Sequence, residues 1–185
     1  MSNAGDNRFV AFLGSINVGG HKATKEQLCA AFEAVGYERV ETFIASGNVI
    51  FDAGGSSATD RVAAAAERAL ERELGFAAPV YLRSAAAVRA IAGAGPFDAG
   101  ELEACVGKPQ VILLREVPSA ADRKRALQLS TAADRIAFGP GELHWLPAGR
   151  MTDSELDLKA LTKLIGPSTT RTLNTIQRIT AKFLA

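Results

Sequence analysis

The sequence predicts an α+β fold of two ferredoxin-like units in tandem, each a split βαβ layout with an antiparallel sheet and helices on one face. Two observations lead to this prediction. In the first half, strand-like apolar runs and segments with helical spacing follow one another in the order β-α-β-β-α-β. In the second half the order is β-α-β-β-α-α, which nearly repeats the elements but not the residues.

The length of the chain bounds the number of domains. Its 185 residues suffice for one full domain or two small fused units, and the apolar content of 48% is that of an ordinary globular protein. A stretch rich in glycine separates the two halves. We expect a disordered start at 1–7, a first unit at 8–92, a linker loop at 93–107, and a second unit with a C-terminal helix at 108–185.

The elements of the first half follow from apolar patterns and stop signals. Thr24 and Gly36 are residue types that cap and end a helix, and Gly47 with Asn48 tolerates the positive φ of a hairpin turn. The expected elements are a strand at 8–16, a helix between Thr24 and Gly36, hairpin strands at 39–45 and 49–52, a helix at 59–74, and a strand at 79–83.

The second half is interpreted in the same way. Pro118 and Ser119 open a helix, and Gly139-Pro140-Gly141 forms the turn of a hairpin. The expected elements are a short helix at 84–92, a strand at 110–115, a helix from 118 to about 129, hairpin strands at 135–138 and 142–146, a helix around 156–165, and a last helix that starts at 169–172 and reaches Phe183.

Charge and cysteine content exclude several classes of protein. The formal net charge of +1 does not indicate a nucleic-acid binder as a whole, and no apolar run approaches the roughly 20 residues of a membrane span. No signal peptide opens the chain, so we expect no membrane partner. Cys29 and Cys105 lie far apart, which argues against a disulfide and fits the cytoplasm. His21 and His144 lack companions at ligand spacing, so we expect no metal site and no cofactor.

The best local chemistry lies where the first strand ends. In the expected topology this exit and the first hairpin turn lie at the same end of neighbouring strands. Short polar side chains, a lysine and backbone N–H groups unshielded by a Cβ would meet there, and a helix N-terminus adds roughly 0.3–1 kcal/mol in favour of an anion. The candidate ligand-binding residues of the two loops are Asn17, Gly19, Gly20, Lys22, Ser46, Gly47 and Asn48.

A purely structural role for these loops is the alternative. The glycine pair would then permit a tight strand-to-helix turn, Gly47 and Asn48 would be the residues that a twisted hairpin requires, and Asn17 would brace the loop. Neither loop contains a phosphate-binding, dinucleotide-binding or nucleophile-elbow motif.

The C-terminal segment carries a basic bias. It holds five cations and no acidic residue from Lys159 onward, so the last 27 residues carry +5 and the remainder about −4. One interpretation is a contact surface for an anion or RNA, and the other is a solvated helix face. Aromatic residues are scarce there, which weakens a base-stacking role.

Three stretches resemble the signatures of the bacterial domain of unknown function 1697 family. They are FLGSINVGG at 12–20, TFIASGNVIF at 42–51 and TTRTLNT at 169–175. The resemblance implies an α+β fold of two ferredoxin-like halves, and it implies no established activity. It adds Arg171, Asn174 and Thr175 to the candidate ligand-binding residues.

The resemblance has departures that bear on a site. The family usually has Arg-Gly where this chain has Gly14 and Ser15, and Asn-Trp where it has Thr172 and Leu173. A missing arginine removes a bidentate cation, and a missing tryptophan removes a stacking surface.

Three functions compete at this point. The first is binding of a small anion, a phosphate or carboxylate compound, at the joined loops. The second is nucleic-acid binding through the basic C-terminal segment, and the third is a protein-interaction module. No nucleophile–base pair is visible, so binding is favoured over catalysis, and the sequence decides neither enzyme activity nor oligomeric state.

Overall fold

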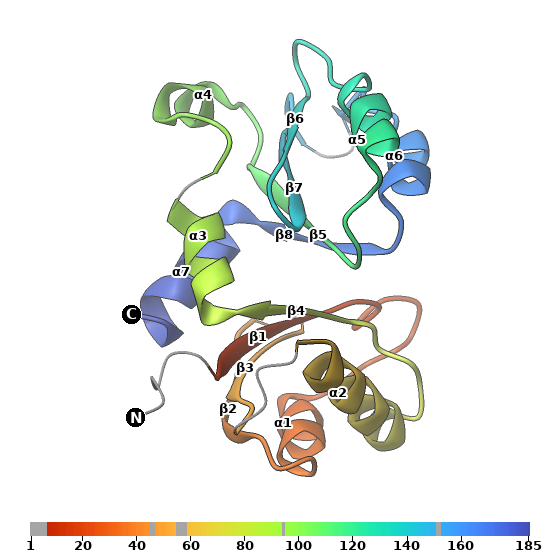
Figure 1. Cartoon of the computed structure of the whole chain (residues 1–185), viewed down its shortest axis with the longest axis vertical. Coiled ribbons are helices and arrows are strands. Elements are labelled where there is room, and N and C mark those ends of the chain that lie inside the picture. The colour runs from red at the N-terminus through yellow and green to blue at the C-terminus, as the bar shows by residue number, and fades with distance from the viewer. Residues whose placement is uncertain (1–6, 45–46, 55–58, 94, 151–152) are drawn as a thin grey trace. The chain divides into compact units, whose positions relative to one another are not determined.

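The computed structural model describes residues 7–44, 47–54, 59–93, 95–150 and 153–185 (Figure 1). The expected disordered start lies almost wholly outside these residues. The chain divides into two compact units, one formed by Met1–Arg89 with Ile179–Ala185 and the other by Ala90–Arg178.

The first unit contains a four-stranded antiparallel sheet in the order β2-β3-β1-β4. Together with the chain order β-α-β-β-α-β, this is the ferredoxin-like arrangement that the sequence predicts. Its elements are β1 (Arg8–Leu13), α1 (Lys25–Glu33), β2 (Glu38–Thr42), β3 (Asn48–Asp52), α2 (Thr59–Leu74), β4 (Val80–Ser84) and the start of α3 (Ala85–Gly93).

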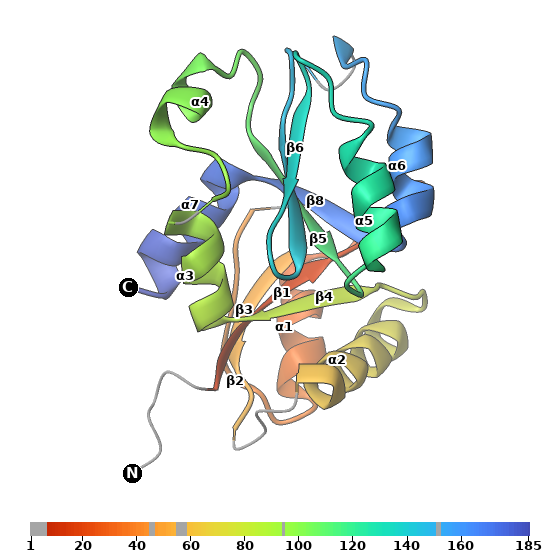
Figure 2. The ribbon, with the colours of Figure 1, turned by 45° about the horizontal axis from the view of Figure 1, so that its top comes forward.

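Strand β1 is the centre of this sheet. All six of its residues are buried, and it pairs with β3 on one side and β4 on the other, with Phe9 opposite Phe51 and Ser84. Helices α1 and α2 cover one face of the sheet (Figure 2). The core between them is apolar, and its fully buried side chains include Phe9, Leu13, Phe32, Phe51 and Leu70.

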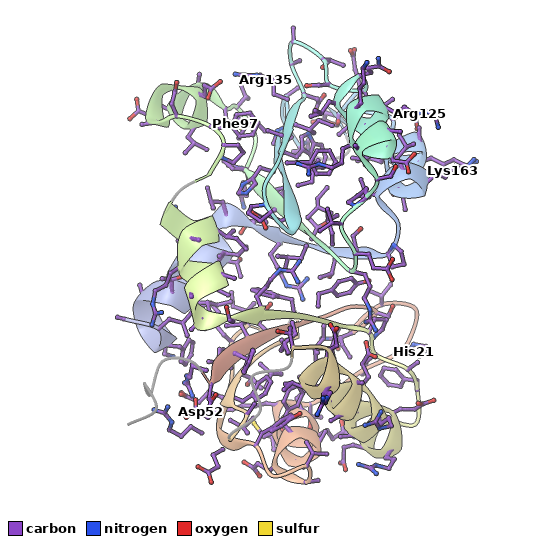
Figure 3. The ribbon with its side chains drawn as sticks, in the orientation of Figure 1. His21, Asp52, Phe97, Arg125, Arg135 and Lys163 are labelled. Carbon is purple, nitrogen blue, oxygen red and sulfur yellow. The ribbon has the colours of Figure 1, made fainter. Side chains whose placement is uncertain are left out.

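Ion pairs connect the strands of the same sheet at the end where β1 begins and β3 ends. Arg8 Nη1 lies 3.0 Å from Asp52 Oδ1, and Arg39 also pairs with the Asp52 carboxylate, which is labelled in Figure 3. Ion pairs as well as backbone hydrogen bonds therefore connect β1, β2 and β3. Only about a tenth of the Arg8 side chain is exposed. Pairs that are partly buried in this way are weakened less by salt than pairs on the surface.

The second unit repeats the arrangement with the sheet order β6-β7-β5-β8. Helices α5 and α6 pack against each other on one face, over a core that includes Leu143, Trp145 and Leu161. Its elements are α4 (Ala99–Ala104), β5 (Gln110–Leu114), α5 (Ala120–Leu127), β6 (Arg135–Phe138), β7 (Glu142–Leu146), α6 (Leu158–Ile165), β8 (Ser168–Thr172) and most of α7 (Leu173–Phe183).

The presence of strand β8 shows that the element order expected for the second half was wrong at its end. The sequence placed residues 169–172 at a helix start, but Ser168–Thr172 pairs antiparallel with β5 along its whole length, with Arg171 opposite Val111. Its residues read STTRT, without the apolar alternation that marks a strand. Threonine nevertheless favours extended backbone because of its branched Cβ. The second half is thus β-α-β-β-α-β with a further helix.

The segment expected to be a linker loop contains a helix of its own. Asp98 caps α4 through a capping box, because its side chain accepts from the Glu101 N–H while the Glu101 side chain accepts from the Asp98 N–H. The contacts also divide the chain at Ala90 and group the last seven residues with the first unit. There, Arg89 Nε donates to the Leu184 carbonyl at 2.8 Å.

The first prediction concerns Gly47, which has φ +72° and would place a Cβ 3.1 Å from Leu13 Cβ. We expect Gly47→Ala to lower the free energy of unfolding by about 2–3 kcal/mol, because strain from φ and steric overlap both act. The measurement is urea denaturation followed by far-UV circular dichroism.

The matched control for this change is Gly36→Ala. Gly36 also has a positive φ, +82°, but no atom within 4 Å of an added Cβ. Only the strain of the positive φ should therefore lower the free energy of unfolding, by roughly 1 kcal/mol. Equal destabilisation by the two variants would contradict the close packing of Gly47.

Candidate functional site

The loop that follows β1 is a tight reversal. The Asn17 N–H donates to the His21 carbonyl at 2.7 Å, and the His21 N–H donates to the Val18 carbonyl at 3.1 Å. Asn17, Gly19 and Gly20 all have positive φ, at 59°, 60° and 89°. Glycine meets this requirement without a steric cost, so the turn accounts for both glycines locally.

The same reversal presents backbone N–H groups to solvent. Within the described part of the chain, the N–H groups of Gly19 and Gly20 have no hydrogen-bond acceptor, whereas Val18 forms an antiparallel bridge with His21. All three residues are exposed, and Val18 has 66% of its surface accessible. A Cβ added to either glycine would meet nothing within 4 Å. Two consecutive backbone donors, on residues that are exposed and carry no side chain, are therefore left without a partner among the described residues.

The cations and the ring beside this loop come from the segment that leads into α1 and from the first residue of that helix. Lys22 and Lys25 are exposed, and the His21 ring stacks on Phe76 with centroids 4.4 Å apart and planes at 15° (Figure 3). The N-terminus of α1 is itself capped: Thr24 Oγ1 accepts from the Gln27 N–H at 3.2 Å, and Gln27 Oε1 accepts from the Thr24 N–H at 3.0 Å. The loop amides, rather than the helix end, are thus the main donors available to a ligand.

The hairpin between β2 and β3 lies beside this loop, as the topology led us to expect. The Leu13 N–H donates to the Gly47 carbonyl at 2.8 Å, and an added Cβ on Gly47 would also lie 3.4 Å from Ile16. Gly47 and Asn48 are buried, and Asn48 Nδ2 donates to the Phe43 carbonyl at 2.8 Å. These two residues support the backbone here. Ser46 lies outside the described residues.

The remaining candidates lie in the second unit. Arg171 is a buried residue of β8, and its Nη1 donates to Thr169 Oγ1 at 2.9 Å and to the Thr170 carbonyl at 2.8 Å. Burial lowers the pKa of Arg171 to about 10, so the guanidinium remains charged at neutral pH. Asn174 is exposed in the first turn of α7, and the Thr175 N–H donates to Thr172 Oγ1. The candidate residues therefore fall on two different units.

The five cations of the C-terminal segment do not share one element. Lys159 and Lys163 lie on α6, and Lys163 extends into solvent (Figure 3). Arg171 is buried in β8, Arg178 is on α7, and the Lys182 ammonium lies over the Phe183 ring at 4.9 Å. A nucleic-acid surface needs clustered, accessible charge, and a buried arginine and a ring-bound lysine contribute little to one.

A buried pair in the second unit was not among the predicted residues. His144 Nε2 lies 3.4 Å from Glu142 Oε1, with 6% and 7% of the side chains exposed. The Gly141 N–H donates to Glu142 Oε2, and a Cβ on Gly139 would lie only 1.9 Å from Glu142 Oε1. The signal in the sequence was Glu and His at alternate positions of a predicted strand, which puts them on one face.

Asp134 is a second residue that the sequence analysis did not single out. Its fully buried carboxylate accepts from Trp145 Nε1 at 3.0 Å, Ser154 Oγ at 2.8 Å, and the N–H groups of Ala148 and Glu155. Burial by itself would raise the pKa of Asp134, but these hydrogen bonds outweigh it and lower the pKa below its usual value. The carboxylate joins β6, β7 and the segment before α6.

The described residues offer neither a disulfide nor a group of side chains suited to a metal ion. Cys29 and Cys105 are free, and burial raises the pKa of each thiol. Across the described ranges, no three His, Cys, Asp or Glu side chains are grouped in a way that could hold a metal ion. In the same ranges, no helix combines the length and apolar content that a bilayer span requires.

The fold defines a class: α+β proteins built from two ferredoxin-like units in tandem. A family model described as "Protein of unknown function (DUF1697)" matches residues 7–144. Because the match spans well over half of the chain, the protein belongs to this family. Two of the three signature stretches lie inside the matched residues, and the stretch at 169–175 lies beyond them.

A solved structure supports the same fold. The chain is similar to a conserved bacterial protein, SP0830, from Streptococcus pneumoniae, with 20% identity and a TM-score of 0.73 over 95% of this chain and 99% of that one. At this level of identity the likeness shows the fold alone. No curated protein sequence matches the chain.

The second prediction concerns Asp134. We expect Asp134→Ala to lower the free energy of unfolding by about 3 kcal/mol, because the buried donors of Trp145 and Ser154 lose their acceptor. The measurement is urea denaturation followed by the fluorescence of Trp145, the single tryptophan of the chain. Destabilisation below 1 kcal/mol would contradict the role of this carboxylate.

The third prediction is the pH dependence that Asp134 imparts. Its pKa is lower in the folded state than in the unfolded chain, where it lies near 3.8. The stabilisation is therefore complete above about pH 5 and is lost as the pH falls through 3.8 towards the folded pKa. Between pH 6 and pH 3 the wild type should lose more stability than Asp134→Asn, and equal losses would contradict this assignment.

Proposed function

We propose that the protein binds a small anion, a phosphate or carboxylate compound, on the loop Asn17–Lys22. The observation that carries the proposal is the pair of consecutive N–H groups on the exposed residues Gly19 and Gly20, which have no acceptor in the described part of the chain. Successive backbone N–H groups in turn conformations are a recurring way in which proteins hold anions.

The charges near the loop support the same choice of ligand. Lys22 lies two residues after Gly20, and Lys25 opens α1 with its side chain exposed. His21 is held flat against Phe76, so one face of its ring is already covered. A charged acceptor forms stronger hydrogen bonds with backbone N–H groups than a neutral one.

The glycine pair fits a binding role as well as a turn. A turn requires positive φ at Gly19 and Gly20, but it does not require that both Cβ positions face empty space. Absent side chains let a ligand approach the backbone closely. Gly47 and Asn48 act in this proposal as the support that fixes the loop, because both are buried.

We assign binding rather than catalysis to the loop. Its described residues provide donors and cations, but no nucleophile with a base beside it. As part of the same proposal we place the protein in the cytoplasm, which the two free thiols support.

The fourth prediction tests this proposal by isothermal titration calorimetry of the full chain with pyrophosphate and with citrate. We expect Lys22→Ala to raise the dissociation constant about tenfold, because one charge-assisted hydrogen bond is lost, and Lys22→Glu to raise it further. The matched control is Lys124→Ala, an exposed lysine on α5 of the other unit. Affinity that is unchanged in Lys22→Glu, or lost equally in Lys124→Ala, would overturn the proposal.

A further inference from the structure

A cavity of about 250 Å³ lies in the second unit, separate from the loop described above. Its walls come from the end of α3, the segment around α4, and the strands β5 and β7, with the first turn of α7. Apolar side chains make up most of the lining, including Ile91, Phe97, Leu102, Leu146 and Leu173.

The volume limits the ligand to about the size of one ring. A cavity of roughly 150 Å³ with apolar walls accepts benzene, whereas sites for drug-sized molecules start near 300 Å³. Small residues open the wall at Ala92, Gly93, Gly95 and Ala99. The Gly95 backbone approaches the ring of His144, because a Cβ there would lie 3.7 Å from both Nδ1 and Cε1.

Each polar side chain of the lining has one donor engaged outside the cavity. His144 directs Nε2 at the Glu142 carboxylate, 3.4 Å away. Gln110 Nε2 donates to the Lys108 carbonyl at 2.7 Å, and Gln177 Nε2 donates to the Ala92 carbonyl at 3.4 Å. An imidazole that donates through Nε2 keeps Nδ1 as an acceptor, and each amide keeps its oxygen. His144 Nδ1, beside Gly95 on the cavity wall, is therefore available as an acceptor, and each amide retains one N–H as well as its oxygen.

Arg135 holds the Phe97 ring in place as one wall of the cavity. Its guanidinium lies 5.3 Å from the centre of the Phe97 ring and pairs with Glu101 on α4 at 2.5 Å (Figure 3). These contacts fix Phe97 as a wall, since the ring is stacked between the cavity and a cation that is itself paired.

We infer that this cavity binds a neutral single-ring molecule that carries a hydroxyl or amino donor, and that His144 Nδ1 is the acceptor of that donor. An apolar wall selects the ring, and the Nδ1 acceptor of His144 selects a ligand with a donor. A carboxylate ligand is disfavoured, because it would bring a second negative charge close to Glu142.

The test is a chemical-shift titration of the uniformly ¹⁵N-labelled full chain with phenol, anisole and benzoate. Anisole retains the ring but has no donor, and benzoate replaces the donor with a charge. We expect phenol to shift the resonances of Gly95 and His144 saturably, with a dissociation constant on the order of 1 mM. Anisole and benzoate should bind at least tenfold more weakly.

Two kinds of variant separate the site from the fold. Gly95→Leu fills the cavity without the strain of a positive φ, and Ala99→Phe fills it from the other side, so either should abolish phenol binding. Ala121→Leu, at an exposed position of α5, is the matched control. His144→Phe retains an apolar wall but removes the Nδ1 acceptor. It should therefore lower the affinity for phenol to that for anisole.

The following results would overturn the inference that the cavity binds a single-ring donor. The inference fails if 10 mM phenol leaves the resonances of the cavity lining unchanged, or if benzoate binds more tightly than phenol. It also fails if the two cavity-filling variants bind phenol as the wild type does. Equal affinities of phenol and anisole in the wild type would remove the role assigned to His144 Nδ1.

Discussion

The hydrogen bond from the Leu13 N–H to the Gly47 carbonyl is the contact on which the candidate site depends. It extends the pairing of β1 with β3 to Leu13, the last residue of β1, and to Gly47, which precedes β3, so the chain leaves the sheet in a fixed direction. Gly47 has to be glycine for this approach, because its Cα lies against Leu13 and Ile16. The loop from Asn17 to Lys22 then turns back on itself, closed by the hydrogen bond from the Asn17 N–H to the His21 carbonyl.

The two units use one arrangement of strands for different chemistry. In the first, the sheet is held by Arg8 and Asp52 at one end and by the glycine contact at the other, and its polar groups of interest lie on the surface. In the second, the polar groups are interior: Asp134 collects four donors, and Glu142 holds His144 at the wall of a cavity. Buried polar groups are retained where each has a partner, which is the case for both residues.

The sequence predicted the fold class and most of the elements. Helix α2 was placed at Thr59–Leu74, the bounds that the structure shows, because its apolar face repeats at helical spacing and Gly75 follows it. Strand β8 was missed because its five residues are four hydroxyl-bearing side chains and an arginine, and only its pairing with β5 reveals it. Tertiary contacts decide such segments, and a local pattern does not contain them.

The site was predicted only in part, and for physical reasons. Topology alone placed the two loops of the first unit together, since neighbouring antiparallel strands bring their ends to one edge. It could not indicate that Asn48 is buried, nor that Ser15 adopts φ 58° at a position where the family pattern has glycine. The cavity beside His144 is built from α3, α4, β5, β7 and α7, and no short stretch of sequence contains such a combination.

The amides of Val18, Gly19 and Gly20 decide whether this loop binds an anion, and the decisive measurement observes them individually. Pyrophosphate titrated into the ¹⁵N-labelled chain should shift these three resonances downfield and saturably, while the amides of Gly36 and Gly75 stay in place. Unchanged resonances at Val18, Gly19 and Gly20, or shifts spread evenly over all exposed glycines, would contradict the account and leave the glycine pair with its role in the turn.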